Sequence, residues 1–271
     1  MPSLFETLAE LEARGEPAAL CTVVRERGSV PRHAGSKMIV FPDGRITGTI
    51  GGGEMESRVI QEARAALADG TPRMVHYELV DPQSGDPGVC GGEVDIFVEP
   101  LKPQPTVLVI GGGHVGRAVV HLAKWLGFRV ALADDRPEFC NPQATPGADE
   151  YHLGPTAQLP QKFKFHSQTF IVMPTRGTAF DVDGLPPLLD MPHAYLGVIG
   201  SRRRWATTVK QLEAKGVARD KLARVHAPMG LELNAETPEE IAVSIMAEVL
   251  MRLRGGTGQP MKWLESETAE K

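Results

Sequence analysis

A glycine-rich stretch in the middle of the chain has the spacing of a phosphate-binding turn. Gly111, Gly113 and Gly116 form the pattern G-x-G-x-x-G directly after the branched apolar run 106–110, and a helical apolar pattern follows. The first glycine permits a tight turn, the second lets a phosphate approach the backbone, and the third packs helix against strand. The free amides at the start of the helix then face the phosphate. Asp134 follows about 20 residues later, where an acid meets a ribose hydroxyl.

Asp134 has a second interpretation, because Asp135 and Arg136 come directly after it. The carboxylate either holds a ribose or anchors the loop through Arg136. His114 lies inside the fingerprint and either lines the ligand crevice or caps the turn. The other histidines are scattered without i, i+4 spacing, which disfavours a structural zinc site or an H-E-x-x-H hydrolase. No G-x-S-x-G elbow of an α/β-hydrolase is present.

A thiol lies in another glycine-rich loop, 81–92. Cys90 is flanked by Gly88, Gly91 and Gly92, whose missing side chains let a bulky ligand approach the sulfur. A thiolate is a soft metal ligand and a reactive nucleophile. The alternative is that Cys90 is a small buried residue in a tight turn, as free cysteines usually are. The residue type alone favours this second interpretation.

Two further predicted helices begin at glycines. Gly51, Gly52 and Gly53 open one of them, but Glu54 and Glu56 occupy its first turn. These carboxylates complement the helix dipole themselves and would repel a phosphate. We therefore expect close packing, or backbone contact with a neutral ligand edge, with Glu56 as a hydrogen-bond acceptor.

The other helix begins after Gly200, at Ser201 and Arg202, and three arginines occupy its first turn. A cationic helix N-terminus is a better phosphate site than an acidic one. The alternative is that the run 202–204 is only a solvated face of the helix.

These residues require two scaffolds. The chain has 271 residues, and about 150 residues per domain suggests two domains. The sequence predicts a small N-terminal α+β domain, residues 1–101, followed by a short proline-rich linker. Residues 106–264 alternate strand and helix patterns, which predicts a Rossmann-like domain with a doubly wound parallel sheet. The expected fold class is therefore α/β.

Composition excludes several functional classes. The chain is 42% hydrophobic and 23% charged, as is usual for globular proteins, and no apolar run approaches the roughly 18 residues of a membrane span. The net charge of −5 argues against nucleic acid as a partner. Three scattered cysteines suit a reducing compartment, and the acidic N-terminal segment fits a surface helix better than a signal peptide. We expect a cytoplasmic protein without a membrane or nucleic-acid partner.

Several of these motifs resemble those of the XdhC/CoxI family, accessory proteins for the maturation of molybdenum hydroxylases such as xanthine dehydrogenase. The resemblance is collinear and covers nearly the whole chain. One departure is visible: Thr175 and Asp181 keep the family spacing, but Arg176 replaces the usual histidine. Any proton-transfer or ligand role of that histidine therefore does not carry over. The matching segments are 28–32, 48–56, 88–92, 111–116, 134–139, 195–204, 226–231 and 237–242.

The resemblance implies that the protein handles the molybdenum cofactor, as molybdopterin or its dinucleotide. Such proteins protect the cofactor while a cysteine desulfurase installs its sulfido ligand, and then deliver it to the hydroxylase apoenzyme. It also implies a homodimer and favours a functional Cys90, as a metal ligand. No catalytic residue is assigned. The implied cofactor-binding residues are Cys90, Gly51, Gly52, Gly53, Glu56, Gly91, Gly92, Gly111, Gly113, His114, Gly116, Asp134, Ser201 and Arg202.

The alternative function is that of an oxidoreductase that uses NAD(P) in the Rossmann-like domain. Gly111, Gly113, Gly116 and Asp134 support it, but no obvious acid or base for a substrate accompanies them. The fold class alone does not decide between the two functions.

Overall fold

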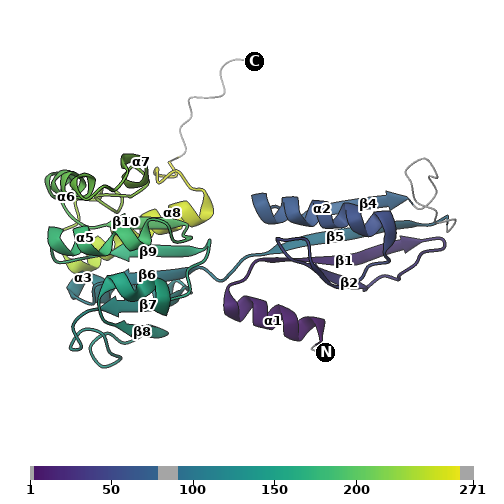
Figure 1. The fold of residues 1–271 in the computed structure, drawn as a ribbon, viewed down its shortest axis with the longest axis horizontal. Coiled ribbons are helices and arrows are strands. Elements are labelled where there is room, and N and C mark those ends of the chain that lie inside the picture. Colours follow the sequence, from purple (N-terminus) through teal and green to yellow (C-terminus); the bar gives the residue numbers. More distant parts are fainter. Residues whose placement is uncertain (1–2, 79–90, 263–271) are drawn as a thin grey trace, which may run out of the picture. The chain divides into compact units, whose positions relative to one another are not determined.

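The structure is a computed structural model that describes residues 3–78 and 91–262. It divides into two compact units, Met1–Gln104 and Pro105–Lys271, which Figure 1 shows as an antiparallel sheet with two helices and a parallel sheet between helices. The division falls within the proline-rich segment that the sequence predicts as a linker.

The N-terminal unit is built on one five-stranded antiparallel sheet. Its strands lie in the order β3-β2-β1-β5-β4. The long central strands β1 and β5 pair along their whole length, with a register shift between Val23 and Arg25. The strands are β1 (Ala18–Arg27), β2 (Lys37–Val40), β3 (Ile46–Gly48), β4 (Arg73–Glu78) and β5 (Glu93–Leu101).

Two helices cover the opposite faces of this sheet (Figure 1). Alternate strand residues point to opposite faces, so each helix has its own core. Helix α2 (Gly53–Asp69) buries Met55, Val59 and Ala63 against one face. Helix α1 (Leu4–Arg14) packs Leu11 with Ile39 on the other.

The C-terminal unit contains a five-stranded parallel sheet in the order β10-β9-β6-β7-β8. After β8 the chain crosses to the other side of β6, which makes the space between β6 and β9 the topological switch point of a doubly wound sheet. The Rossmann-like prediction is confirmed. The strands are β6 (Thr106–Ile110), β7 (Arg129–Asp134), β8 (Glu150–Leu153), β9 (Thr169–Met173) and β10 (Tyr195–Val198).

Helices lie on both faces of the parallel sheet (Figure 1). Strand β6 points Val107 and Val109 toward one helical layer and Leu108 and Ile110 toward the other. The first layer contains α3 (His114–Trp125) and α8 (Pro238–Arg254). The second contains α4 (Leu159–Lys162), α5 (Thr178–Gly184), α6 (Arg202–Ala214) and α7 (Arg219–Leu222).

A buried carboxylate fastens α8 to the sheet and to the loop before it. Glu248 on α8 accepts hydrogen bonds from the Tyr195 hydroxyl at 2.7 Å and the Gly230 amide at 2.6 Å, and its other oxygen lies 2.8 Å from His226 Nδ1. Burial raises the pKa of Glu248, but the hydrogen bonds from His226, Tyr195 and Gly230 outweigh it and lower the pKa to about 2.

We predict that Glu248→Gln removes a pH-dependent part of the stability of this unit. Because the folded pKa lies below the ordinary value, the contribution is fully present above about pH 4.5 and is lost as the pH falls toward 2. The shift corresponds to stability on the order of 3 kcal/mol. Urea midpoints measured between pH 3 and pH 7 should show a large gap between wild type and variant at pH 7 that narrows at pH 3. A gap of constant size would contradict this account.

Candidate functional site

The glycine fingerprint folds as a strand, a turn and a helix. Gly111 has φ +120°, a conformation that favours glycine. At Gly116, a Cβ atom would lie 1.8 Å from the Gly111 carbonyl oxygen, so the first turn of α3 packs directly on the loop. Around Gly113 there is open space, and α3 begins at His114 with no acid in its first turn and no side-chain cap. The amides at this helix end therefore face solvent or a ligand.

Asp134, at the end of β7, is engaged inside this loop. Its side chain is 2% exposed and accepts the Gly112 amide at 2.7 Å. It also accepts the amide, Nε and Nη2 of Arg136, at 3.0, 2.9 and 2.9 Å. Burial raises the pKa of this carboxyl, but the bonds from Arg136 and Gly112 outweigh it and lower the pKa. Of the two interpretations, loop anchoring is the one that the geometry contains, and contact with a ribose stays a prediction.

A cavity of about 300 Å³ lies at the carboxyl ends of β6, β7 and β9. Of the expected ligand residues, Gly111 and Asp134 line it. Asp135 and Arg176 also line it and form a bidentate ion pair, with nitrogen to oxygen distances of 3.0 and 3.2 Å. The Arg176 guanidinium lies 3.7 Å from the centre of the Phe180 ring, which is also part of the wall.

His114 lies in a different cavity, of about 500 Å³, between α3 and the start of α8. It shares this space with Arg117, His121 and Glu239. The structure therefore separates His114 from the residues at the strand ends, although the sequence places it within the fingerprint.

Ser201 and Arg202 stand at the start of α6. The Ser201 hydroxyl accepts the Arg204 amide at 3.1 Å and is the N-cap of the helix. Arg202 is exposed and forms no ion pair within the described part of the chain. Neither residue lines the cavity at the strand ends.

The sequence did not predict the strongest polar cluster in this region. Asp181 is completely buried and accepts Arg204 Nε at 3.0 Å and Nη2 at 2.7 Å. It also accepts the Thr175 hydroxyl, and Arg204 Nη1 donates to the Thr175 carbonyl at 3.2 Å. Burial raises the pKa of Asp181, and the bonds from Thr175 and Arg204 act in the opposite direction. The constant spacing of Thr175 and Asp181 was the available signal for this cluster, which fixes the loop after β9.

In the N-terminal unit, Glu56 organises the glycine run that precedes α2. One carboxylate oxygen, Oε2, accepts the Thr49 hydroxyl at 2.6 Å and the amides of Ile50 and Gly52 at 3.3 and 3.2 Å. The Gly51 amide donates to the Thr49 hydroxyl at 3.2 Å. Three consecutive amides thus have partners inside the loop. A further role for Glu56 as acceptor from a ligand stays a prediction.

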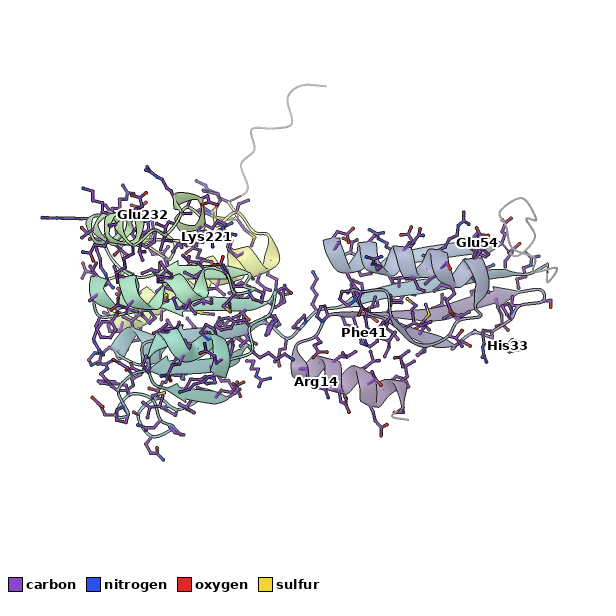
Figure 2. All side chains as sticks on the ribbon, viewed as in Figure 1. Arg14, His33, Phe41, Glu54, Lys221 and Glu232 are labelled. Atoms are coloured by element: carbon purple, nitrogen blue, oxygen red, sulfur yellow. The ribbon has the colours of Figure 1, made fainter. Side chains whose placement is uncertain are left out.

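The glycine loops of this unit meet each other at one end of its sheet. A Cβ atom at Gly51 would lie 2.8 Å from Pro31, and one at Gly92 would lie 2.2 Å from the Ser29 carbonyl oxygen. Ser29 also forms a parallel bridge with Gly91. In Figure 2, His33 and Glu54 lie at this end of the unit, and Arg14 and Phe41 lie at the other.

Part of this end is bare backbone. Gly35, Gly52, Gly53 and Gly91 all have positive φ values, and an added Cβ atom would meet nothing within 4 Å at any of them. Cys90, the neighbour of Gly91 in the sequence, lies outside the described residues, and so does Gly88.

The other two cysteines are not reactive thiols. Cys21 and Cys140 are buried, and burial raises the pKa of both, to about 12 for Cys21. Within residues 3–78 and 91–262, no group of three or more His, Cys, Asp or Glu side chains is arranged to hold a metal ion. Nor does any helix in these ranges have the length and apolarity needed to cross a membrane.

Fold and loops together define a class: a glycine-rich antiparallel unit followed by a Rossmann unit. Residues 107–249 match the XdhC Rossmann domain, and residues 11–78 match the XdhC and CoxI family. The chain belongs to the XdhC/CoxI family.

Three curated relatives are similar to the chain. The uncharacterized protein YqeB of Escherichia coli K12 is 37% identical over 250 residues, which are 92% of this chain and 46% of YqeB. A protein of Bacillus subtilis 168 named as a probable xanthine dehydrogenase component is 30% identical, covering 58% of this chain and 45% of its own length. The molybdenum cofactor insertion chaperone PaoD of Escherichia coli K12 is 26% identical, covering 87% and 83%. The chain thus spans about half the length of the first two relatives.

A solved structure has the same overall fold. It is described as a xanthine dehydrogenase from Bacillus halodurans, and it is 22% identical with a TM-score of 0.50, covering 94% of this chain and 96% of that one. At this identity the likeness concerns the fold alone.

Proposed function

We propose that the chain is an accessory protein that binds the molybdenum cofactor, protects it during sulfuration and delivers it to a hydroxylase of the xanthine dehydrogenase type. Membership of the XdhC/CoxI family supports this proposal. So do the names of two relatives, a molybdenum cofactor insertion chaperone and a probable component of xanthine dehydrogenase. The cofactor is then the cargo of the protein, and its partners are the hydroxylase apoenzyme and a cysteine desulfurase.

One observation carries the proposal, the bare glycine backbone at one end of the N-terminal unit. Gly52, Gly53 and Gly91 lack nearby atoms on the side where a side chain would stand, so a large flat molecule can approach the main chain there. Glu56 and Pro31 hold the loop from behind. The sequence adds Cys90 next to Gly91, a thiol that can serve as a soft ligand for molybdenum.

We predict that Cys90→Ala reduces retention of the cofactor at least tenfold. The purified protein is incubated with isolated molybdenum cofactor and desalted, and the bound molybdenum is measured by elemental analysis. Cys140→Ala, which removes a buried thiol from the other unit, is the matched control and should retain the metal. Circular dichroism checks that both variants are folded. Equal retention by wild type and Cys90→Ala would refute a ligand role for this thiol.

The same experiment tests the alternative of an NAD(P)-dependent oxidoreductase. The cavity at the strand ends favours that function, but Asp134 already accepts four hydrogen bonds from Gly112 and Arg136. Saturable binding of NADH or NADPH with hydride transfer, and no retention of molybdenum, would reverse the ranking. The proposed homodimer is tested separately by light scattering.

A further inference from the structure

The cavity of the C-terminal unit has the position of a ligand site. It lies at the carboxyl ends of β6, β7 and β9, where the order of the sheet reverses. In open α/β sheets, ligands bind in the crevice at this switch point. Gly111 lines the cavity, and α3 begins three residues later with free amides and no acid. A phosphate can therefore lie at the edge of the cavity.

The size and walls of the cavity fit one heterocyclic base. Its volume of about 300 Å³ is at the lower end of the range of small-molecule sites, roughly 300–1,000 Å³. Pro155, Pro174 and Phe180 offer flat apolar surfaces, and small residues such as Ala133 and Ala179 complete the wall. Such walls suit the faces of a planar ring.

The polar groups of the wall are one carboxylate and one guanidinium that pair with each other. Asp135 follows β7 and Arg176 follows β9, and their side chains are 39% and 41% exposed. Because both are already partly hydrated, exchanging this pair for contacts with a ligand costs little desolvation. A carboxylate accepts amino groups of a base, and a guanidinium donates to its ring nitrogens and carbonyl oxygens.

The neighbouring acid is excluded from such a role. Asp134 is 2% exposed at its side chain, and its four hydrogen bonds hold the turn at Gly112 and the segment at Arg136. Contact with a ligand would break these bonds and leave a buried amide without a partner, which is costly.

We infer that the C-terminal unit binds a nucleoside 5′-phosphate, with its base in the cavity against Asp135 and Arg176, and that Asp134 supports the loop without touching the ligand. This site is separate from the glycine loops of the N-terminal unit. The inference therefore stands or fails independently of the cofactor-binding proposal.

The test is calorimetric titration of the full chain with AMP, GMP and CMP, and with ribose 5-phosphate, which lacks a base. At least one nucleotide should bind at least tenfold more tightly than ribose 5-phosphate. R176Q and D135N should each weaken that nucleotide about tenfold, since each removes hydrogen bonds of a charged group. The double variant should lose little more than either single one, because the two residues act as a pair.

The matched control is K221Q, which removes the exposed Lys221–Asp190 ion pair in the same unit, outside the cavity; Lys221 is labelled in Figure 2. K221Q should bind as wild type does. Melting temperatures of R176Q and D135N should stay within about 2 °C of wild type, whereas D134N should melt clearly lower. The inference is overturned by any of three results: no nucleotide binds, R176Q and D135N bind normally, or D134N loses binding with an unchanged melting temperature.

Discussion

Arg204→Met should lower the free energy of unfolding of the C-terminal unit by about 3–5 kcal/mol. Removing one partner of a buried ion pair leaves the other charge without compensation, and losses of this size are usual. Asp181 is only 1% exposed at its side chain, and Arg204 is its ion-pair partner. The same guanidinium also donates to Thr175, so the loop after β9 loses its attachment to α6.

Urea denaturation at neutral pH measures this effect. The control is K221M, which removes an exposed ion pair of the same unit with a nitrogen to oxygen distance of 2.7 Å and should cost less than about 1 kcal/mol. A second variant, D181L/R204M, removes both charges and should recover a large part of the loss. If R204M were as stable as K221M, the pair would contribute nothing measurable.

Gly116→Ala should destabilise the same unit by at least about 2 kcal/mol. In an ordinary helix, alanine is favoured over glycine by roughly 1 kcal/mol. Here the new methyl group would lie 1.8 Å from the Gly111 carbonyl oxygen and 3.5 Å from Pro174. The helix must move away from the loop, and overpacking of this kind costs roughly 1–3 kcal/mol or more.

Gly113→Ala is the matched control within the same fingerprint. Gly113 has φ −66° and open space around its Cα atom, so alanine fits sterically and only the loss of a good N-cap residue is expected. Thermal or urea unfolding compares the two variants. A Gly116→Ala protein as stable as wild type would show that α3 can shift away from the loop at no cost.

The sequence determined the secondary structure around the fingerprint and the class of the C-terminal fold. Strand, turn and helix follow from local features, namely a branched apolar run, glycines at fixed spacing and a helical apolar pattern. The capped start of α8, at Thr237 and Pro238, is local for the same reason. The edge strand β8 and the short helix α7 were not predicted, because Glu150–Leu153 and Arg219–Leu222 are short and lack a long apolar pattern.

The sequence also identified most of the glycine positions that the structure brings together, but not the partners of the charged residues. Asp134 was expected opposite a ribose, and the structure gives it Arg136 and the amide of Gly112. Arg204 was one of three arginines in a row, and only its contact with Asp181 distinguishes it from Arg202.

The physical reason is the range of the interactions. Periodicity and turn chemistry act over a few residues and can be read along the chain. The partners of a carboxylate or guanidinium depend on which loops the sheet brings together, as for Asp135 with Arg176 and Asp181 with Arg204. Local sequence therefore decided the elements of this protein, whereas tertiary packing decided which charges are used to hold loops and which remain at the cavity.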